Sequence, residues 1–262
     1  MSSHLHPLNG VGMSRPSLQG CEFPAPPGPQ PSSLIESSSR RRFLRMAARG
    51  TVAGLAAVTA MQPLAPRPAL AQTALSPDAA LQELLDGNKR FMAGHLSAQE
   101  HDLDILRQHT IEKQEPFAVV LSCADSRVPV ELVFDQTIGH IFVARIAGNI
   151  ATSEIIASLE YGAGVLGTRV ILVMGHGSCG AVKATIQAKQ VPGQISALYP
   201  HIQPAVDQAG PNLESATKAN ARIQAALLRQ ASTVISGLVK ENKLKVVAAH
   251  YDLGTGTVSV LD

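Results

Sequence analysis

Four short, continuous apolar runs are the feature that most constrains how this chain can fold. They are Phe117–Ser122, Ile141–Ile146, Val170–Met174 and Leu244–Ala249, each rich in β-branched residues and bounded by glycine or polar residues. Apolar runs without polar alternation are typical of strands that are covered on both faces, and such strands occur in mainly parallel sheets. We therefore expect these runs to form four parallel strands with helices on both sides.

The segments between the runs have helical periodicity. Ser76-Pro77 has the pattern of a helix N-cap followed by proline at the first helical position, and leucines recur behind it at helical spacing, which predicts a helix over residues 78–94. A final segment, Thr257–Leu261, follows a glycine-rich turn and predicts a C-terminal edge strand. The fold class is α/β, with a sheet flanked by helices. The remaining predicted helices are Ser153–Leu166, Cys179–Lys189 and one long helix near Leu213–Lys240.

Residues 1–71 differ from the rest of the 262-residue chain in composition and charge. Residues 1–38 are rich in proline, serine and glycine, a composition typical of disorder. The following segment Ser39–Arg45, with the sequence SRRRFLR, resembles the twin-arginine export signal. Behind it, the uncharged run Gly50–Pro66 is shorter than the roughly 20 apolar residues that a membrane span requires.

Ala69–Ala71 supplies a small-x-small cleavage site, so we expect the mature chain to begin at Gln72. This leader predicts a periplasmic or otherwise exported protein that crosses the membrane through the twin-arginine machinery, with no stable membrane span. The alternative is a basic amphipathic anchor helix. Gly50, Gly54 and Pro63 disfavour that helix because they interrupt its apolar face.

The mature body, residues 72–262, is predicted to be a single domain. It carries 15 basic and 18 acidic residues, so the basic character of the whole chain belongs to the leader. The chain has no Trp, and only 3% of its residues are aromatic. Without a basic surface or stacking platforms, the body lacks what nucleic-acid binding requires, and we expect no nucleic-acid partner.

The two cysteines of the body occupy similar places in the predicted sheet. Cys123 follows the first apolar run, and Cys179 follows the third, just behind His176. In open parallel sheets, ligands bind beyond the carboxyl ends of the strands. Two cysteines and a histidine match the three protein ligands of a catalytic zinc site, which leaves a fourth position open. Asp125 and Arg127 add a carboxylate and a guanidinium beside this set.

Each of these residues has an ordinary structural alternative. A buried cysteine often acts only as a small apolar residue, and Asp125 and Arg127 would also suit a surface ion pair. The combination at two strand ends nevertheless favours metal binding. A second motif, Gly175–Gly180, matches the G-x-G-x-x-G pattern of dinucleotide sites. That pattern also requires an acidic residue about 20 positions later, where Tyr199–Gln203 offers neither strand nor acid, so a dinucleotide site is disfavoured.

With these residues assembled, the chain resembles the β-class carbonic anhydrases. Cys123–Pro129 and Gly175–Val182 resemble the two signature segments of that family. The resemblance covers almost all of residues 78–262. The further matching segments are Asp86–Phe91, Phe142–Asn149, Leu159–Tyr161 and Tyr251–Gly256.

The resemblance implies a carbonic anhydrase that hydrates CO2 reversibly to bicarbonate and a proton by zinc-bound hydroxide. Cys123, His176 and Cys179 would hold one Zn2+ per chain. Asp125 would either accept a hydrogen bond from the hydroxide or close the site as a fourth ligand. Arg127 would hold Asp125 away from the metal in the open, active state.

The resemblance also implies a substrate pocket for CO2 or bicarbonate, formed by Gln114, Phe142, Gly148 and Tyr161, and a homodimer or a multiple of it. The chain departs from the family pattern at His140 and Ile146. Since it has no Trp, it lacks the usual tryptophan of the bicarbonate regulatory pocket.

Two other functions stay open at this point. One is a different hydrolase on the same zinc site, with CS2 or COS as its substrate. The other is a non-catalytic protein in which Cys123 and Cys179 form a redox-active pair. A disulfide requires none of Asp125, Arg127 and His176, so the neighbouring residues favour the zinc enzyme.

Overall fold

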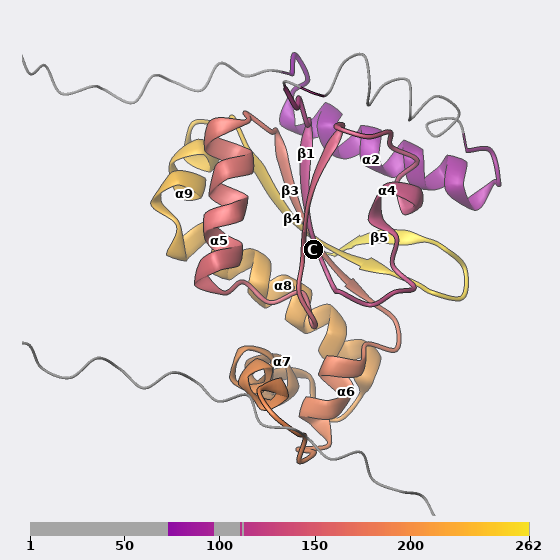
Figure 1. Cartoon of the computed structure of the whole chain (residues 1–262), viewed down its shortest axis with the longest axis vertical. Helices are drawn as coiled ribbons and strands as arrows, with labels where there is room; N and C mark the ends of the chain where they lie inside the picture. Colours follow the sequence, from indigo (N-terminus) through magenta and orange to yellow (C-terminus); the bar gives the residue numbers. More distant parts are fainter. Residues whose placement is uncertain (1–72, 97–110, 112, 262) are drawn as a thin grey trace, which may run out of the picture. The chain divides into compact units, whose positions relative to one another are not determined.

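A five-stranded sheet lies at the centre of the part of the chain that the structure describes (Figure 1). The structure, a computed structural model, describes residues 73–96, 111 and 113–261. The predicted leader and its cleavage site lie outside the described residues. The strand order is β2-β1-β3-β4-β5, with the first four strands parallel and β5 antiparallel to β4. The strands are β1 Ala118–Ser122, β2 Ile141–Arg145, β3 Val170–His176, β4 Lys245–Tyr251 and β5 Val258–Leu261.

This sheet confirms the predicted fold class. Every apolar run became a parallel strand, and the last segment became the antiparallel edge strand. Strand β3 extends two residues beyond the predicted end at Met174, because its last residues still pair with β4. His176 therefore belongs to the strand and not to the loop that follows.

Helices cover both faces of the sheet, and the strand residues alternate between them. Val120 and Leu172 pack in the same core as α2 (Pro77–Met92) and α4 (Val130–Val133). On the opposite face, neighbouring residues such as Val119 and Ile171 pack against three other helices, which Figure 1 shows on the far side of the sheet from α2. These helices are α5 Ser153–Glu160, α8 Leu213–Ala231 and α9 Thr233–Lys240.

Helix α2 begins where the sequence predicts. Ser76 is its N-cap, its Oγ accepts a hydrogen bond of 3.2 Å from the Ala79 amide, and Pro77 is the first helical residue.

Among the described residues, none of the helices combines the length and the hydropathy that a membrane-spanning helix requires.

The prediction of one long helix over Leu213–Lys240 is wrong, because the helix is interrupted at Ser232. This residue has extended backbone angles (φ −104°, ψ 119°). Its buried hydroxyl accepts a hydrogen bond of 3.0 Å from the Ile235 amide and donates one of 2.6 Å to Glu160. A side-chain cap and a tertiary contact thus start a second helix inside one continuous helical pattern.

The predicted helix Ser153–Leu166 changes type after Glu160. Residues Tyr161–Val165 form a π-helical turn. Gly162 in this turn approaches the sheet so closely that a Cβ would lie 2.6 Å from Val119 Cγ2.

A third, smaller core lies near the carboxyl ends of the strands. It is formed by Cys123, Cys179, Ile150, Val182 and residues from α7 and α8. Helix α7, in which Pro200 takes an early helical position, was not among the predicted helices. The elements on this side are α6 Gly180–Ile186, the short 3-10 helix η3 Ile195–Leu198 and α7 Tyr199–Ala209.

Candidate metal centre

The strand order reverses between β1 and β3, and we call the space beyond the carboxyl ends of these two strands the crevice. The chain passes from β1 to β2 on one side and then returns across β1 to β3 on its other side. Where strand order reverses in this way, the loops leave in opposite directions and ligands bind between them. Cys123 follows β1 directly, His176 ends β3, and Cys179 precedes α6.

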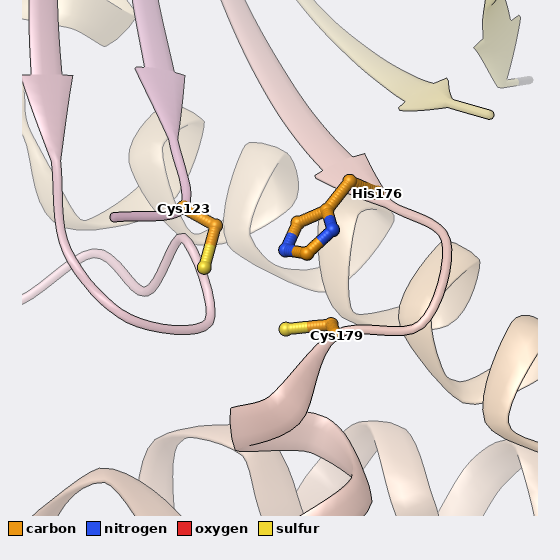
Figure 2. Close-up of side chains that lie close together, drawn as sticks. All are labelled: Cys123, His176 and Cys179. Carbon is orange, nitrogen blue, oxygen red and sulfur yellow. The ribbon is translucent and has the colours of Figure 1, made fainter. Parts of the chain in front are cut away.

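The two sulfurs and a ring nitrogen converge in this crevice, as Figure 2 shows. The ligand atoms of Cys123, His176 and Cys179 all lie within 4.8 Å of one another, and all three residues are buried. Gly175 precedes His176 where β3 touches α8, and a Cβ there would lie 3.1 Å from the backbone oxygen of Thr217. A larger residue would require α8 to move by a few tenths of an ångström, so glycine favours the close approach of β3 to α8.

One ring nitrogen of His176 forms a hydrogen bond, and the other has no hydrogen-bond partner among the described residues. Its Nδ1 lies 2.9 Å from the Gly177 carbonyl, which can only accept, so Nδ1 carries the proton. Nε2 then offers its lone pair to the crevice, and this buried atom has no hydrogen-bond partner in the described residues. A buried acceptor without a partner is costly. Two sulfurs and one such nitrogen fit the tetrahedral coordination of zinc.

The two cysteines interact directly. A hydrogen bond between the side chains lowers the pKa of Cys123 and raises the pKa of Cys179, where burial acts in the same direction. The Gly148 amide also donates a hydrogen bond of 3.3 Å to the Cys123 sulfur. A cation that binds both sulfurs would displace any thiol proton that remains on them.

Asp125 lies at the edge of the cluster and is held by Arg127. The guanidinium donates to both carboxylate oxygens, at 2.9 and 2.8 Å, and the Arg127 amide donates a third bond of 3.0 Å. These contacts hold the pKa of Asp125 well below its usual range. One carboxylate oxygen also lies 3.9 Å from His176 Nε2, so a charged acceptor borders the space between the ligands.

Two residues that were not predicted to belong to the site support it. Arg145 donates to the carbonyls of Cys123 and Asp125, at 3.0 and 2.6 Å. From α8, the buried Asn220 donates a bond of 2.8 Å to the Gly148 carbonyl. Buried asparagines within an amphipathic helix are a sequence signal for such contacts, because each must find a partner.

The Gly148 loop also depends on glycine. Its φ of +78° is unfavourable for other residues, and a Cβ would lie 2.7 Å from Ile202 in α7. The loop can thereby approach the Cys123 sulfur while α7 packs behind it.

The other residues of the predicted substrate pocket lie apart from this cluster. Phe142 and Tyr161 pack on each other with ring centroids 6.2 Å apart, and Tyr161 is 45% exposed. Gln114 is exposed as well. In the described residues, no hydrogen bond or ring contact joins these three side chains to the cysteines or to His176.

Comparisons with known proteins agree on one family. The sequence profile described as carbonic anhydrase matches residues 118–258. Carbonic anhydrase 2 of Mycobacterium tuberculosis is 32% identical over 198 residues, which cover 71% of this chain and 94% of that protein. The carbonic anhydrase of Mycolicibacterium smegmatis is 34% identical over 196 residues, covering 71% and 93%.

The fold gives the same answer. The solved structure of the β-carbonic anhydrase CcaA superposes with a TM-score of 0.56 and 26% identity, covering 70% of this chain and 87% of that one. The profile, the relatives and the fold together cover the strand ends that carry Cys123, His176 and Cys179. The chain therefore belongs to the β class of the carbonic anhydrases and is an enzyme of that family.

Proposed function

We propose that Cys123, His176 and Cys179 hold one Zn2+ per chain and that the enzyme uses it to hydrate CO2 reversibly to bicarbonate and a proton. The observation that carries this proposal is the convergence of two sulfurs and an unpartnered, buried imidazole nitrogen within 4.8 Å. Family membership supports CO2 hydration as the reaction, and the set of two sulfurs and one imidazole nitrogen supports zinc as the metal.

When bound, zinc supplies a Lewis acid that lowers the pKa of water to about 7 and so makes a nucleophile available near neutral pH. The residues of the chain then do the positioning. Asp125 stays ionised because Arg127 holds its pKa low, so it can only accept a hydrogen bond. A carboxylate fixed in two directions by Arg127 can orient one lone pair of the nucleophile toward CO2.

The same Asp125 can also act as an inhibitory ligand. If it left Arg127 and bound the metal, it would fill the fourth position and exclude water. The doubly hydrogen-bonded pair with Arg127 favours the open arrangement, because each charge-assisted bond must break before the carboxylate can move.

We also propose that the substrate pocket is completed in a homodimer or a multiple of it. Gln114, Phe142 and Tyr161 do not reach the cluster of their own chain, whereas Tyr161 and Val165 expose apolar surface, at 45% and 55%. A second subunit would cover this surface and let Phe142 and Tyr161 border the site of its partner.

For residues 1–71 we propose a cleaved twin-arginine leader and an exported enzyme, on the strength of the Ser39–Arg45 motif. Cell fractionation of the full chain beside an Arg40→Lys/Arg41→Lys variant tests this. We expect the exported form to begin at Gln72 by mass spectrometry and the variant to stay inside. Equal export of both chains would refute this route.

The first experiment is stopped-flow CO2 hydration from pH 6.5 to 9, with zinc counted on the same sample. We expect fast turnover and one zinc per chain. Full zinc without turnover even at pH 9 would exclude CO2 as the substrate, and CS2 and COS would be assayed next. No zinc, together with oxidation of Cys123 and Cys179 to a disulfide, would instead support the redox pair.

A further inference from the structure

Arg145 continues the pairing of β1 and β2 beyond the point where their backbones separate. The last backbone bond between these segments runs from the Ile146 amide to the Ser122 carbonyl, at 3.1 Å. The next carbonyls of the β1 chain receive a side chain instead. Arg145 Nε donates to Cys123 at 3.0 Å, and Nη2 donates to Asp125 at 2.6 Å.

The planar fork of arginine suits this task. Its Nε and Nη2 point in the same direction, so one rigid group can bond to two carbonyls at once. The Asp125 carbonyl also accepts a bond of 3.1 Å from the Val128 amide. The backbone on both sides of Ala124 is thus fixed by a charged donor, and bonds to charged groups are stronger than neutral ones.

The two clamped residues contribute the sulfur and the carboxylate that border the crevice. Arg145 itself is exposed, and its hydrogen bonds within the described residues go to the backbone carbonyls of these two residues and not to the sulfur or the carboxylate. In the described part of the chain no carboxylate forms an ion pair with it, so its charge is directed at the two carbonyls.

We infer that Arg145 is a positioning residue, which fixes Cys123 and Asp125 relative to His176 and Cys179. This inference rests on the proposed zinc site. Groups that orient metal ligands are worth about 10–100-fold in metal affinity or activity. The clamp should therefore act on metal affinity and on kcat, while KM changes little because Arg145 does not line the space between the ligands.

The test compares Arg145→Ala and Arg145→Lys with Arg229→Ala. Arg229 is a matched control, because it is also exposed and donates to a backbone carbonyl, that of Val246 at 2.7 Å, at the opposite end of the sheet. Zinc affinity is measured by competition with a chromogenic chelator. The unfolding temperature of the metal-free proteins and the kcat and KM of the zinc-loaded proteins are measured alongside.

We expect Arg145→Ala to bind zinc about 10–100-fold more weakly, with a lower kcat. Its metal-free unfolding temperature should also fall, because two charge-assisted bonds are lost. Arg145→Lys should recover only part of the affinity, because an ammonium group does not span both carbonyls. Arg229→Ala should bind zinc normally.

Unchanged zinc affinity and kcat in Arg145→Ala would overturn the inference. If that variant does not fold, Arg145→Lys decides, and full affinity and kcat in it would also overturn the inference. An equal loss of affinity in Arg229→Ala would do so too, since it would mean that any lost surface arginine weakens binding. Failure of the unchanged protein to bind zinc would instead refute the proposed metal site itself.

Discussion

At the carboxyl end of the sheet Asp125 meets Arg127 at 2.8 Å, and at the amino end Asp78 meets Lys245 at 2.6 Å. The pair with the shorter contact is the more exposed one. The Asp78 side chain is 82% exposed, whereas that of Asp125 is only 17% exposed. Asp125 also accepts three bonds from one partner, whereas Asp78 accepts a single bond from a flexible ammonium.

The same contrast holds for the surroundings. At the amino end, Asp78, Lys245 and Arg229 line an open cavity of about 430 Å³. At the carboxyl end, Asp125 borders buried sulfurs and a buried imidazole. Contact distance alone therefore does not identify a functional pair. Burial, the number of donors and the chemistry of the neighbours do.

The largest expected effect at the carboxyl end comes from removing a ligand. Cys179→Ser should reduce the zinc content from about one per chain to near none, because a hydroxyl is a much poorer zinc ligand than a thiolate. Metal analysis of the purified protein measures this. Unchanged zinc content would contradict the assignment of Cys179 as a ligand.

One substitution made at both ends tests the comparison directly. Asp125→Asn should keep its zinc but lose about 10–100-fold in CO2 hydration, because an amide does not replace the ionised acceptor. Asp78→Asn should keep full activity, and its unfolding temperature should barely change, since exposed ion pairs contribute little. Equal activity of the two variants in the stopped-flow assay would refute the proposed role of Asp125.

Two buried asparagines, one near the cluster and one away from it, offer a second matched pair of substitutions. Asn220 bonds to the Gly148 carbonyl near the cluster, and Asn88 bonds to Val133 and Gly256 away from it. Replacing either by alanine should cost about 1–3 kcal/mol of stability, because buried partners lose their bonds. Only Asn220→Ala should also weaken zinc binding. Denaturant unfolding and chelator competition separate the two effects, and equal zinc affinity in both variants would count against a role for Asn220.

The smallest effect concerns a titrating group at the same end. Burial lowers the pKa of His250, so on acidification the unfolded chain takes up its proton first. The stabilising contribution of neutral His250 is complete above about pH 6.5 and is lost as the pH falls toward the folded-state pKa, by at most about 1.4 kcal/mol per pH unit.

His250→Gln should therefore lose less stability between pH 7 and pH 5 than the unchanged protein. Unfolding at several pH values measures this, and the exposed His140 serves as a control through His140→Gln. An identical pH dependence in His250→Gln and the unchanged protein would contradict the argument.

Much of the fold was predictable because continuous apolar runs report strands that are buried on both faces. The break at Ser232 was not, since its cause is a hydroxyl that bonds to Glu160, far away in sequence. Cys123, His176 and Cys179 could be selected as candidate ligands from their places at strand ends, and the structure brings them together. The place of Asn220 in an amphipathic helix signals that it needs a partner, but the partners of Arg145 and Asn220 lie in distant segments, and no local pattern identifies them.

The return of the chain across β1 also has a kinetic consequence. The two halves of the cluster, Cys123 and the His176–Cys179 segment, stand far apart in sequence and meet only when β3 has paired with β1. Such non-local pairing is slow and comes after local structure has formed. An ion that needs both halves cannot assist the early steps of folding. Its binding should instead slow unfolding, because it stabilises the native state but not a transition state in which the two halves have separated.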